Sequence, residues 1–222
     1  MTGRPGAPLP AWDHDEALIA AVRADARGRA RAVAWPPAGA PPVAVVVGRG
    51  GDPAAEVALD AARADGVPVL RRRGGGCAVV LDPGNVIVSL ALPLPGVGGI
   101  TGAFAAISAW LIDALARCGL PGLRQEGTSD LAVGGRKVGG SCLWRTAGLA
   151  YYSTTLLVRP DPALAERYLL HPPREPAYRA GRAHRDFMGA LRDVEPGLTP
   201  AELARRLSPF LQDLPRPGRP PA

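Results

Sequence analysis

Lysine is almost absent from this sequence of 222 residues. Of its 26 basic residues 25 are arginine, and Lys137 is the only lysine; Asn85 is likewise the only asparagine. The chain is rich in Ala, Gly, Pro and Arg, a bias that replaces Lys by Arg wherever either serves. A surviving Lys therefore indicates a site that needs a compact charge on a thin stem and not the wide fork of Arg. Chance survival of one Lys is the alternative.

Cysteine is also scarce, and the chain lacks membrane and secretion signals. Cys77, Cys118 and Cys142 are odd in number and lack metal-ligand spacing, which argues against a disulfide framework or a zinc site. No apolar run approaches the roughly 20 residues that a spanning helix needs. The Pro-rich, acidic segment Met1–Asp15 has no apolar core of a secretory signal. We therefore expect reduced thiols, a cytoplasmic location and no membrane contact.

The net charge of +6 raises the question of a nucleic-acid partner. The arginines are scattered among Asp and Glu, however, and no basic run is interleaved with aromatic residues. This pattern argues against nucleic-acid binding and is typical of a solvated surface. A modest positive balance also attracts acidic partners or phosphates.

The length fits one domain, and its pattern predicts an α+β fold. We expect a disordered lead over residues 1–12, one domain over 13–212 and a Pro/Arg tail over 213–222. Strands cluster in adjacent pairs instead of alternating with helices, which indicates a mixed or mostly antiparallel sheet flanked by helices. Predicted helices cover residues 13–33, 52–65, 101–118, 162–170, 183–192 and 199–211. Predicted strands cover residues 43–47, 67–70, 78–81, 86–92, 131–133, 136–143 and 151–158.

A glycine-rich segment, Arg71-Arg72-Arg73-Gly74-Gly75-Gly76-Cys77, follows the second predicted strand. Glycines let the backbone approach a ligand closely and present N–H groups to an anion. An adjacent Arg can clamp a phosphate or carboxylate through its bidentate fork. A flexible hairpin loop with surface arginines is an equally good interpretation of this segment alone.

The single lysine lies in a second glycine-rich segment, Arg136-Lys137-Val138-Gly139-Gly140-Ser141-Cys142, which follows the turn Gly134-Gly135. A Lys on a strand flanked by glycines can be approached by a ligand from two sides. The alternative is an ordinary exposed Lys on a strand. The Lys and Arg counts favour the functional interpretation.

Together these segments resemble the catalytic domain of lipoate-protein ligases, in the biotin/lipoate A/B protein ligase family. The resemblance runs from about residue 43 to 160. It also includes a Ser129-Asp130-Leu131 segment like the family's Asn-Asp-Leu, and the only Lys falls on the family's Lys. The matching segments are Val46-Val47-Gly48-Arg49, the stretch from Arg71 to Asn85, Ser129-Asp130-Leu131, the stretch from Arg136 to Ser141, and Thr154-Thr155-Leu156-Leu157.

The resemblance implies a class II synthetase-like catalytic domain that binds lipoate or octanoate in an apolar tunnel. ATP with Mg²⁺ would convert the acid to an acyl-adenylate. The acyl group would then pass to a lysine of a lipoyl carrier domain, in 2-oxoacid dehydrogenase subunits or the glycine cleavage carrier protein. Lys137 and Arg72 would hold the acyl carbonyl and the α-phosphate. The other implied acyl- or nucleotide-binding residues are Gly74, Gly75, Gly76, Cys77, Val79, Asp130, Gly140 and Cys142.

Several positions depart from the family pattern. Gly74 stands for Ser/Thr, Cys77 for Gly, Leu81 for His, Ser129 for Asn and Ser153 for His. These changes keep two alternatives open: an ATP-independent octanoyl transferase that accepts from acyl carrier protein, and a non-catalytic protein that binds lipoyl domains or acyl chains. The larger ligases also carry a C-terminal accessory domain. Here helices after residue 160 would cap the tunnel instead, or an accessory chain would supply the function.

Two further features have a functional and an ordinary interpretation. Cys142 follows Lys137 by five residues, so the period of a strand places it on the opposite face unless a bulge intervenes. We favour a pocket-lining role for Cys142 over a nucleophilic one. The segment from Leu170 to Met188 carries Arg179 and Arg182. We favour a surface loop there over a lid that contacts carrier protein or phosphate.

Overall fold

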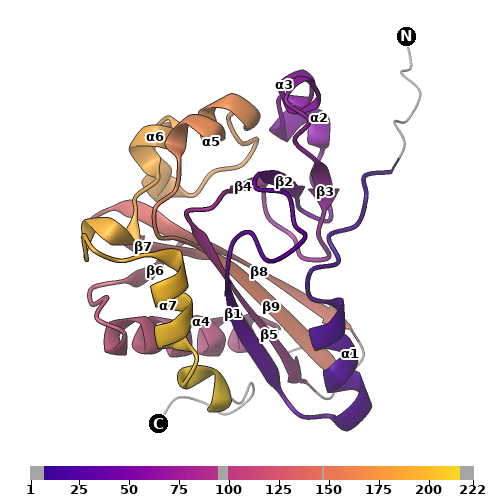
Figure 1. The fold of residues 1–222 in the computed structure, drawn as a ribbon, viewed down its shortest axis with the longest axis vertical. Coiled ribbons are helices and arrows are strands. Elements are labelled where there is room, and N and C mark those ends of the chain that lie inside the picture. Colours follow the sequence, from indigo (N-terminus) through magenta and orange to yellow (C-terminus); the bar gives the residue numbers. More distant parts are fainter. Residues whose placement is uncertain (1–7, 95–99, 147, 216–222) are drawn as a thin grey trace.

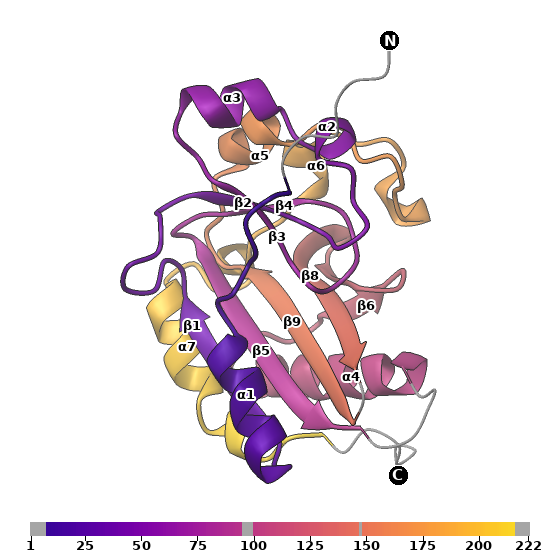
Figure 2. The same ribbon diagram turned by 90° about the vertical axis from the view of Figure 1, so that its right-hand side faces the viewer.

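The protein contains two β-sheets with helices around them (Figure 1 and Figure 2). The structure, a computed structural model, describes residues 8–94, 100–146 and 148–215. The larger sheet is antiparallel throughout, and its strands lie in the order β1-β5-β9-β8-β7-β6. These strands are β1 (Arg29–Ala34), β5 (Asn85–Pro93), β9 (Leu149–Leu157), β8 (Arg136–Thr146), β7 (Asp130–Val133) and β6 (Arg124–Glu126).

The central strand β5 is buried on both faces, which explains its nearly continuous apolar sequence. Its even-numbered residues pack into the main core with helices α4 (Ile100–Arg117) and α7 (Pro200–Leu207). Its odd-numbered residues face the other side, where Ala91 packs under α1 (Glu16–Asp25) and Ile87 packs against the smaller sheet. The larger sheet is therefore covered on both sides.

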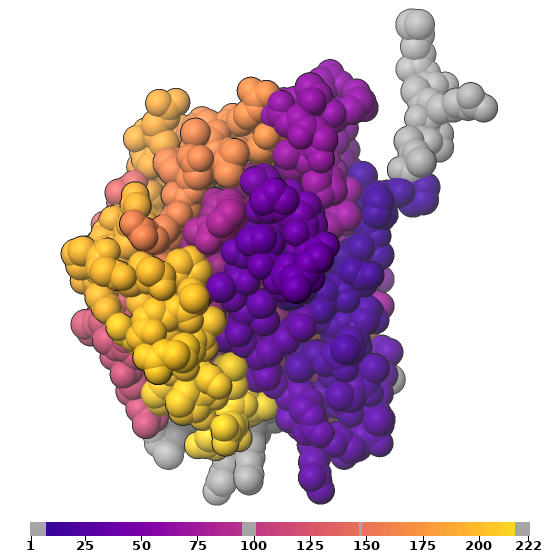
Figure 3. All heavy atoms as spheres, in the orientation of Figure 1, coloured from indigo at the N-terminus to yellow at the C-terminus, as the bar shows by residue number. Residues whose placement is uncertain are grey.

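The smaller sheet has the order β3-β2-β4 and mixes one parallel with one antiparallel pair. Short helices cover it at the end of the molecule remote from α4, and the space-filling view shows α5 packed beside α3 there (Figure 3). The strands are β3 (Val69–Arg71), β2 (Ala44–Val47) and β4 (Val79–Leu81), and the helices are α2 (Pro53–Glu56), α3 (Leu59–Ala64), α5 (Pro162–Tyr168) and α6 (His184–Phe187).

The only asparagine lies where the chain passes from one sheet to the other. Asn85 follows β4 of the smaller sheet and begins β5 of the larger one. Its side chain is fully buried: Oδ1 accepts from the Asp82 amide at 3.2 Å, and Nδ2 donates to Asp82 Oδ1 at 3.1 Å. A buried amide with both ends bonded fixes this corner, and an apolar residue would leave its partners unsatisfied.

The hairpin of β7 and β8 carries a bulge that decides which way Lys137 points. Gly134 and Gly135 form the turn with φ of +57° and +73°, values that favour glycine. Leu131 pairs with Gly139, whereas Ala132 pairs with Lys137, so Val138 is an extra residue in β8. The extra residue changes the alternation of side chains between Lys137 and the rest of the strand.

The predicted fold class is confirmed, but several element boundaries were wrong. The helix predicted over residues 13–33 is α1 followed by β1, because the alternating Arg and small residues of 29–34 form an edge strand whose Ala30 and Ala32 pack on the core. The helix predicted over 52–65 is interrupted between α2 and α3, and strand β6 was not predicted. In the last third, the helices predicted over 183–192 and 199–211 are broken into α6 with the 3-10 turn Leu191–Asp193, and α7 with the 3-10 turn Phe210–Gln212.

The described parts of the lead, expected to be disordered, and of the Pro/Arg tail contact the rest of the chain. Trp12 N donates to the Arg71 carbonyl at 2.8 Å and Arg71 N donates to the Pro10 carbonyl at 2.9 Å, so this segment pairs beside β3. At the other end the Asp213 carbonyl accepts from Trp110 at 3.0 Å. Residues 1–7 of the lead and 216–222 of the tail lie outside the described residues. Within the described ranges, no helix has the length and apolar character needed to cross a membrane.

Candidate active site

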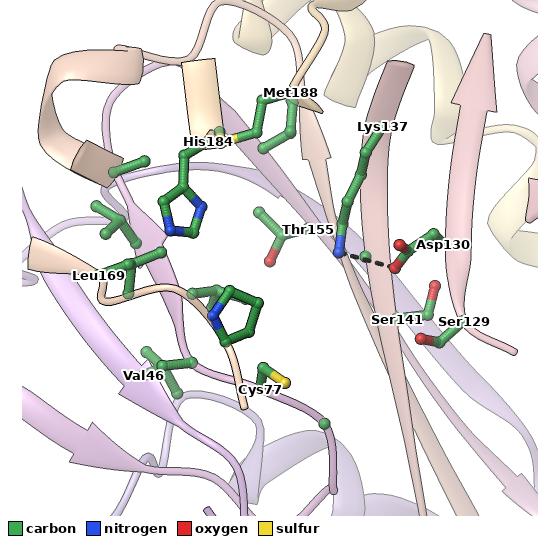
Figure 4. Close-up of a pocket in the computed structure, with 18 of the residues that line it drawn as sticks. Val46, Cys77, Ser129, Asp130, Lys137, Ser141, Thr155, Leu169, His184 and Met188 are labelled. Carbon is green, nitrogen blue, oxygen red and sulfur yellow. Dashed lines mark ion pairs between the residues drawn. The ribbon is translucent and has the colours of Figure 1, made fainter. Parts of the chain in front are cut away.

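A cavity of about 460 Å³ lies between the two sheets and is covered by chain that follows β9. This volume is in the range of small-molecule sites in proteins. Figure 4 shows Val46 and Leu169 on one side of it and Lys137 with Asp130 on the other. The apolar lining residues include Trp12, Val46, Leu81, Ile87, Leu157, Leu169, Phe187 and Met188. The charged lining residues are Glu56, Arg72, Asp82, Glu126, Asp130, Lys137, Asp161, Arg174, Glu175 and Arg179.

Lys137 lines this cavity from β8. Its Nζ lies 2.7 Å from Asp130 Oδ1, and its side chain is 25% exposed (Figure 4). A Cβ added to Gly140 would lie 3.0 Å from both Cε and Nζ of Lys137. Gly140 therefore leaves the space that the lysine side chain occupies, and a side chain at residue 140 would crowd the ammonium.

Asp130 connects Lys137 to the covering chain. It is buried, and its second oxygen accepts a hydrogen bond from Tyr178 Oη at 2.9 Å. Burial, followed by the nearby negative charge of Asp130, raises the pKa of Tyr178 above its ordinary value, so the phenol stays a donor. The result is a continuous chain of contacts from the covering segment through Asp130 to Lys137.

Arg72 lines the cavity, but its donors are used by the protein itself. Nη1 donates to the Val46 carbonyl at 2.8 Å, and Nη2 donates to the carbonyls of Gly75 at 2.7 Å and Cys77 at 2.8 Å. Arg72 therefore holds the glycine-rich loop against β2. The role expected for it, direct contact with a carbonyl or phosphate, would require one of these bonds to be exchanged.

The glycine-rich loop contributes only part of its length to the cavity. Gly76, Cys77 and Val79 are in the lining, whereas Gly74 and Gly75 are not. Gly74 instead packs behind the wall: a Cβ there would lie 2.5 Å from Cys142 Sγ and 2.8 Å from Cys142 Cβ. The loop can lie this close to β8 only because residue 74 has no side chain.

Both Cys142 and Lys137 line the cavity, together with Gly140, because the bulge at Val138 intervenes. The opposite-face placement was expected only for a strand without a bulge, and the bulge at Val138 sets that condition aside. Burial raises the pKa of the Cys142 thiol, and burial followed by the charge of Glu56 raises that of Cys77. A raised pKa leaves little thiolate near neutral pH, which disfavours either thiol as a nucleophile.

The segment from Leu170 to Met188 is not simply a surface loop, and that interpretation is corrected. Pro172, Arg174, Glu175, Pro176, Ala177, Arg179, His184, Phe187 and Met188 from this segment are lining residues. Arg179 is buried, and Gly189 N donates to the Lys137 carbonyl at 2.7 Å. Arg182 is outside the lining and bonds to the carbonyls of Gly135, Tyr178 and Arg179. The segment covers the cavity and is fastened to β8 beside Lys137.

Sequence reasoning missed several lining residues. Trp12 lies in the segment expected to be disordered, although an aromatic residue in a Pro-rich lead is a signal for packing. Glu56 accepts from the Ala78 amide and is buried, but a Glu inside a predicted helix gives no such signal. Tyr178, which is not in the lining but bonds to Asp130, was seen only as part of a loop. Of the departures from the family pattern, Cys77, Leu81, Ser129 and Ser153 line the cavity.

The metal-ligating residue types do not gather at one point. Among the residues that the structure describes, no three or more His, Cys, Asp or Glu side chains are grouped so that they could hold an ion. A cation that enters the cavity with a phosphate ligand would be held mainly by the phosphates and one or two carboxylates, as is usual for Mg²⁺.

Comparisons with known proteins agree on one family. The family described as the lipoyl protein ligase A/B catalytic domain matches residues 7–212. A candidate lipoate-protein ligase A of Aeropyrum pernix is 38% identical over 129 residues, which are 58% of this chain and 48% of that protein. The chain thus spans about half the length of this relative.

Solved structures share the fold at low sequence identity. A lipoate-protein ligase A bound with ATP superposes with a TM-score of 0.74 at 20% identity, covering 90% of this chain and 77% of that one. A bi-partite lipoate protein ligase from Thermoplasma acidophilum, described with its E2 lipoyl domain, gives 0.72 at 20% identity over 93% and 80% of the two chains. Another structure from that organism, with bound lipoic acid, gives 0.71 at 18% identity over 93% and 83%.

Proposed function

The chain belongs to the family of lipoyl protein ligase A/B catalytic domains, and on this basis we propose that it is a lipoate- or octanoate-protein ligase. It activates the acid with ATP and transfers the acyl group to a lysine of a lipoyl carrier domain. The observation that carries the proposal is the placement of Lys137, the only lysine, in the lining of the cavity beside Asp130.

The reaction requires positive charge at one point. An oxygen of the acid attacks the α-phosphorus of ATP, and pyrophosphate leaves as the mixed anhydride forms. The lysine amine of the carrier domain then attacks the acyl carbonyl, and AMP leaves. Negative charge develops on the phosphoryl oxygens in the first step and on the carbonyl oxygen in the second. A fixed ammonium within reach of both stabilises both transition states, and we assign that task to Lys137.

The lining of the cavity suits both substrates. Val46, Leu81, Ile87 and Leu157 offer an apolar wall for the hydrocarbon tail. Arg174 and the backbone of Gly76 and Cys77 lie in the same cavity as Lys137 and could face phosphates. The related structures with ATP and with lipoic acid support this choice of ligands. Mg²⁺ bound to the phosphates would neutralise part of their charge.

Leu81 and Ser129 replace the His and Asn of the family pattern, so two polar contacts are altered. Each hydrogen bond to a charged group contributes about 1.5–3 kcal/mol. We therefore expect weak ATP binding in the isolated chain, tightened by lipoate or octanoate because both ligands share one cavity.

The acceptor and the assembly are also proposals. The Thermoplasma acidophilum ligase is described as bi-partite and together with an E2 lipoyl domain, which supports a lipoyl domain as acceptor and an accessory chain as a partner. The covering segment lines part of the cavity in this chain. We propose a cytoplasmic location, since the free thiols Cys77, Cys118 and Cys142 suit a reducing compartment.

The octanoyl transferase is the second candidate, because two thiols line the cavity. It would require an acyl thioester on Cys77 or Cys142. The raised pKa of both thiols speaks against it.

A single set of incubations separates these functions. The purified protein is mixed with an apo lipoyl domain and either ATP, Mg²⁺ and lipoate, or octanoyl acyl carrier protein without ATP. The ligase acylates the lipoyl domain only in the first mixture. Acylation in the second mixture, with an octanoyl thioester on Cys77 or Cys142 by intact mass, would establish the transferase instead. No product and no thioester in either mixture, also with an accessory chain added, would indicate a binding protein.

A further inference from the structure

We propose that Arg179 is a phosphate-binding residue of this cavity and holds phosphoryl oxygens of the nucleotide. The inference rests on the proposed ATP-dependent function, and of the two arginines that the sequence offers in this segment, Arg179 and Arg182, it selects Arg179. Two independent observations support it: the burial of Arg179 in the cavity wall and a donor atom that the protein leaves without a partner.

The position of Arg179 places its charge inside the cavity. The residue is 4% exposed and is part of the lining. Its Nε donates to the Arg182 carbonyl at 3.0 Å and lies 3.4 Å from Glu175 Oε2. The guanidinium carbon lies 4.9 Å from the centre of the Phe187 ring, which fixes the plane of the fork.

The other side of the same guanidinium lacks a partner. Nη2 is buried and has no hydrogen-bond partner among the residues that the structure describes. A buried donor of a charged group without a partner is costly, because it has lost water and gained nothing in return. Such a donor in a cavity wall indicates a ligand that supplies the acceptor.

A neighbouring arginine shows what a purely structural role looks like. Arg182 also lies against Phe187, with 5.3 Å from its guanidinium carbon to the ring centre. It donates to three backbone carbonyls and does not line the cavity. Arg179, by contrast, lines the cavity and has a buried donor without a partner. Packing on Phe187 alone therefore does not explain why Arg179 is buried there.

The proposed reaction makes phosphate the more suitable occupant. Lys137 already serves the acyl carbonyl in that reaction, so we assign the buried cation of the cavity, Arg179, to the phosphates of the nucleotide. Carboxylates such as Glu56 and Asp82 line the cavity as well, and one or two of them suit an Mg²⁺ ion that enters with the phosphates.

The test compares Arg179→Met with Arg185→Met by calorimetry. Arg185 belongs to the same segment, is exposed and lies outside the lining, so its loss removes an equal charge at the surface. Titrations use ATP with Mg²⁺ in the presence of octanoate, and octanoate alone. We expect Arg179→Met to weaken ATP binding at least about tenfold, as for loss of a bond to a charged group. Its affinity for octanoate alone, and both affinities of Arg185→Met, stay within about twofold of the unchanged protein.

Three other outcomes would overturn the proposed role of Arg179. Equal ATP affinity in the two variants overturns the role of Arg179 while the ligase proposal stands. Loss of octanoate binding with ATP binding kept shows that Arg179 holds the carboxylate and also overturns it. If the unchanged protein binds no ATP, the ligase proposal fails and the inference fails with it.

Melting curves separate ligand binding from folding. The unliganded Arg179→Met protein should melt within about 3 °C of the unchanged one, a range that corresponds to a small change in stability, and the rise in melting temperature caused by ATP should disappear. Should Arg179→Met fail to fold, Arg179→Lys decides: it keeps the charge but not the fork, and an unchanged ATP affinity in it contradicts the proposal.

Discussion

The position of Lys137 depends on glycine at residue 140. A Cβ built on Gly140 would lie 3.0 Å from Lys137 Nζ, so a larger residue there would crowd the ammonium that contacts Asp130. Arg at residue 137 would keep the charge but replace the compact ammonium by a planar fork on a longer side chain, which changes its geometry at the reacting carbonyl. Charge alone is therefore insufficient at this position.

The first prediction follows from the different head groups of Lys and Arg at residue 137. Lys137→Arg should lower the rate of acyl transfer to a lipoyl domain at least about a hundredfold, the loss typical of one oxyanion-type contact. Its circular dichroism spectrum should not change. Steady-state transfer rates measure the effect, and Arg136→Lys is the control on the same strand, since Arg136 is exposed and outside the lining. Near-normal transfer by Lys137→Arg would remove this residue from the mechanism.

A second pair of residues is coupled by packing. This chain has Gly74, where the resembled family has Ser or Thr, and a cysteine at residue 142. Because a Cβ at residue 74 would lie 2.5 Å from the Cys142 thiol, the larger residue at one position requires the smaller residue at the other.

We accordingly predict that Gly74→Ser destabilises the protein by about 1–3 kcal/mol, the usual cost of overpacking. Cys142→Ala alone should cost about 1 kcal/mol or less. In the double variant Cys142→Ala should recover at least half of the loss caused by Gly74→Ser. Urea unfolding of the four proteins gives the coupling energy. Strictly additive effects would show that the two residues do not interact.

At the scale of elements, the strands could be predicted from the sequence more reliably than the helices. The runs that became β2, β5, β8 and β9 are β-branched or apolar, and the Gly134-Gly135 turn marks the hairpin. Residues 29–34 were assigned to a helix because Ala and Arg favour helices, yet pairing with β5 decides their structure. Likewise the sequence does not show that β4 and β5, joined by a short turn, belong to different sheets.

The candidate site likewise contains residues that could be found from the sequence and residues that could not. Residues of the two glycine-rich segments could be found from the sequence because their chemistry is local. The covering segment could not, since its contacts depend on tertiary structure: Tyr178 meets Asp130 across 48 positions of sequence. The bulge at Val138, which brings Lys137 and Cys142 to one cavity, also leaves no mark in the residue pattern.

The covering segment should open more easily without its hydrogen bond to Asp130. Tyr178→Phe keeps the ring contact with Phe187 but removes that bond. We expect trypsin to cleave after Arg174, Arg182 or Arg185 roughly ten times faster in this variant, because local opening becomes less costly. Tyr168→Phe is the matched control: its hydroxyl donates to Asp65 outside the cavity. Equal cleavage rates in both variants would show that Tyr178 does not fasten the segment.

At the scale of the whole molecule, all four tyrosines have a raised pKa. Burial is the main cause for Tyr151, Tyr152 and Tyr178, and the hydrogen bond to Asp65 is the main cause for Tyr168. The unfolded chain releases its tyrosine protons near pH 10, while the folded protein retains them to higher pH. Stability is therefore kept below about pH 10 and falls as the pH rises above it.

Absorbance titration of the phenols tests this prediction. At about pH 10, where free tyrosine is half ionised, the native protein should show less phenolate than the protein in guanidinium, which should show about half of its tyrosines ionised. Denaturant midpoints should decrease above this pH. Native tyrosines that titrate like the unfolded ones would contradict the burial described here.

The central claim is that this cavity activates a carboxylic acid with ATP at Lys137. The most direct measurement is adenylate formation without any acceptor: the protein is mixed with ATP, Mg²⁺ and lipoate or octanoate, and the acyl-adenylate and pyrophosphate are quantified by mass spectrometry and a coupled assay. We expect the unchanged protein to form equal amounts of acyl-adenylate and pyrophosphate, and Lys137→Arg to form neither product above about one hundredth of that rate. Failure of the unchanged protein to form acyl-adenylate at millimolar ATP with the acid present would contradict it.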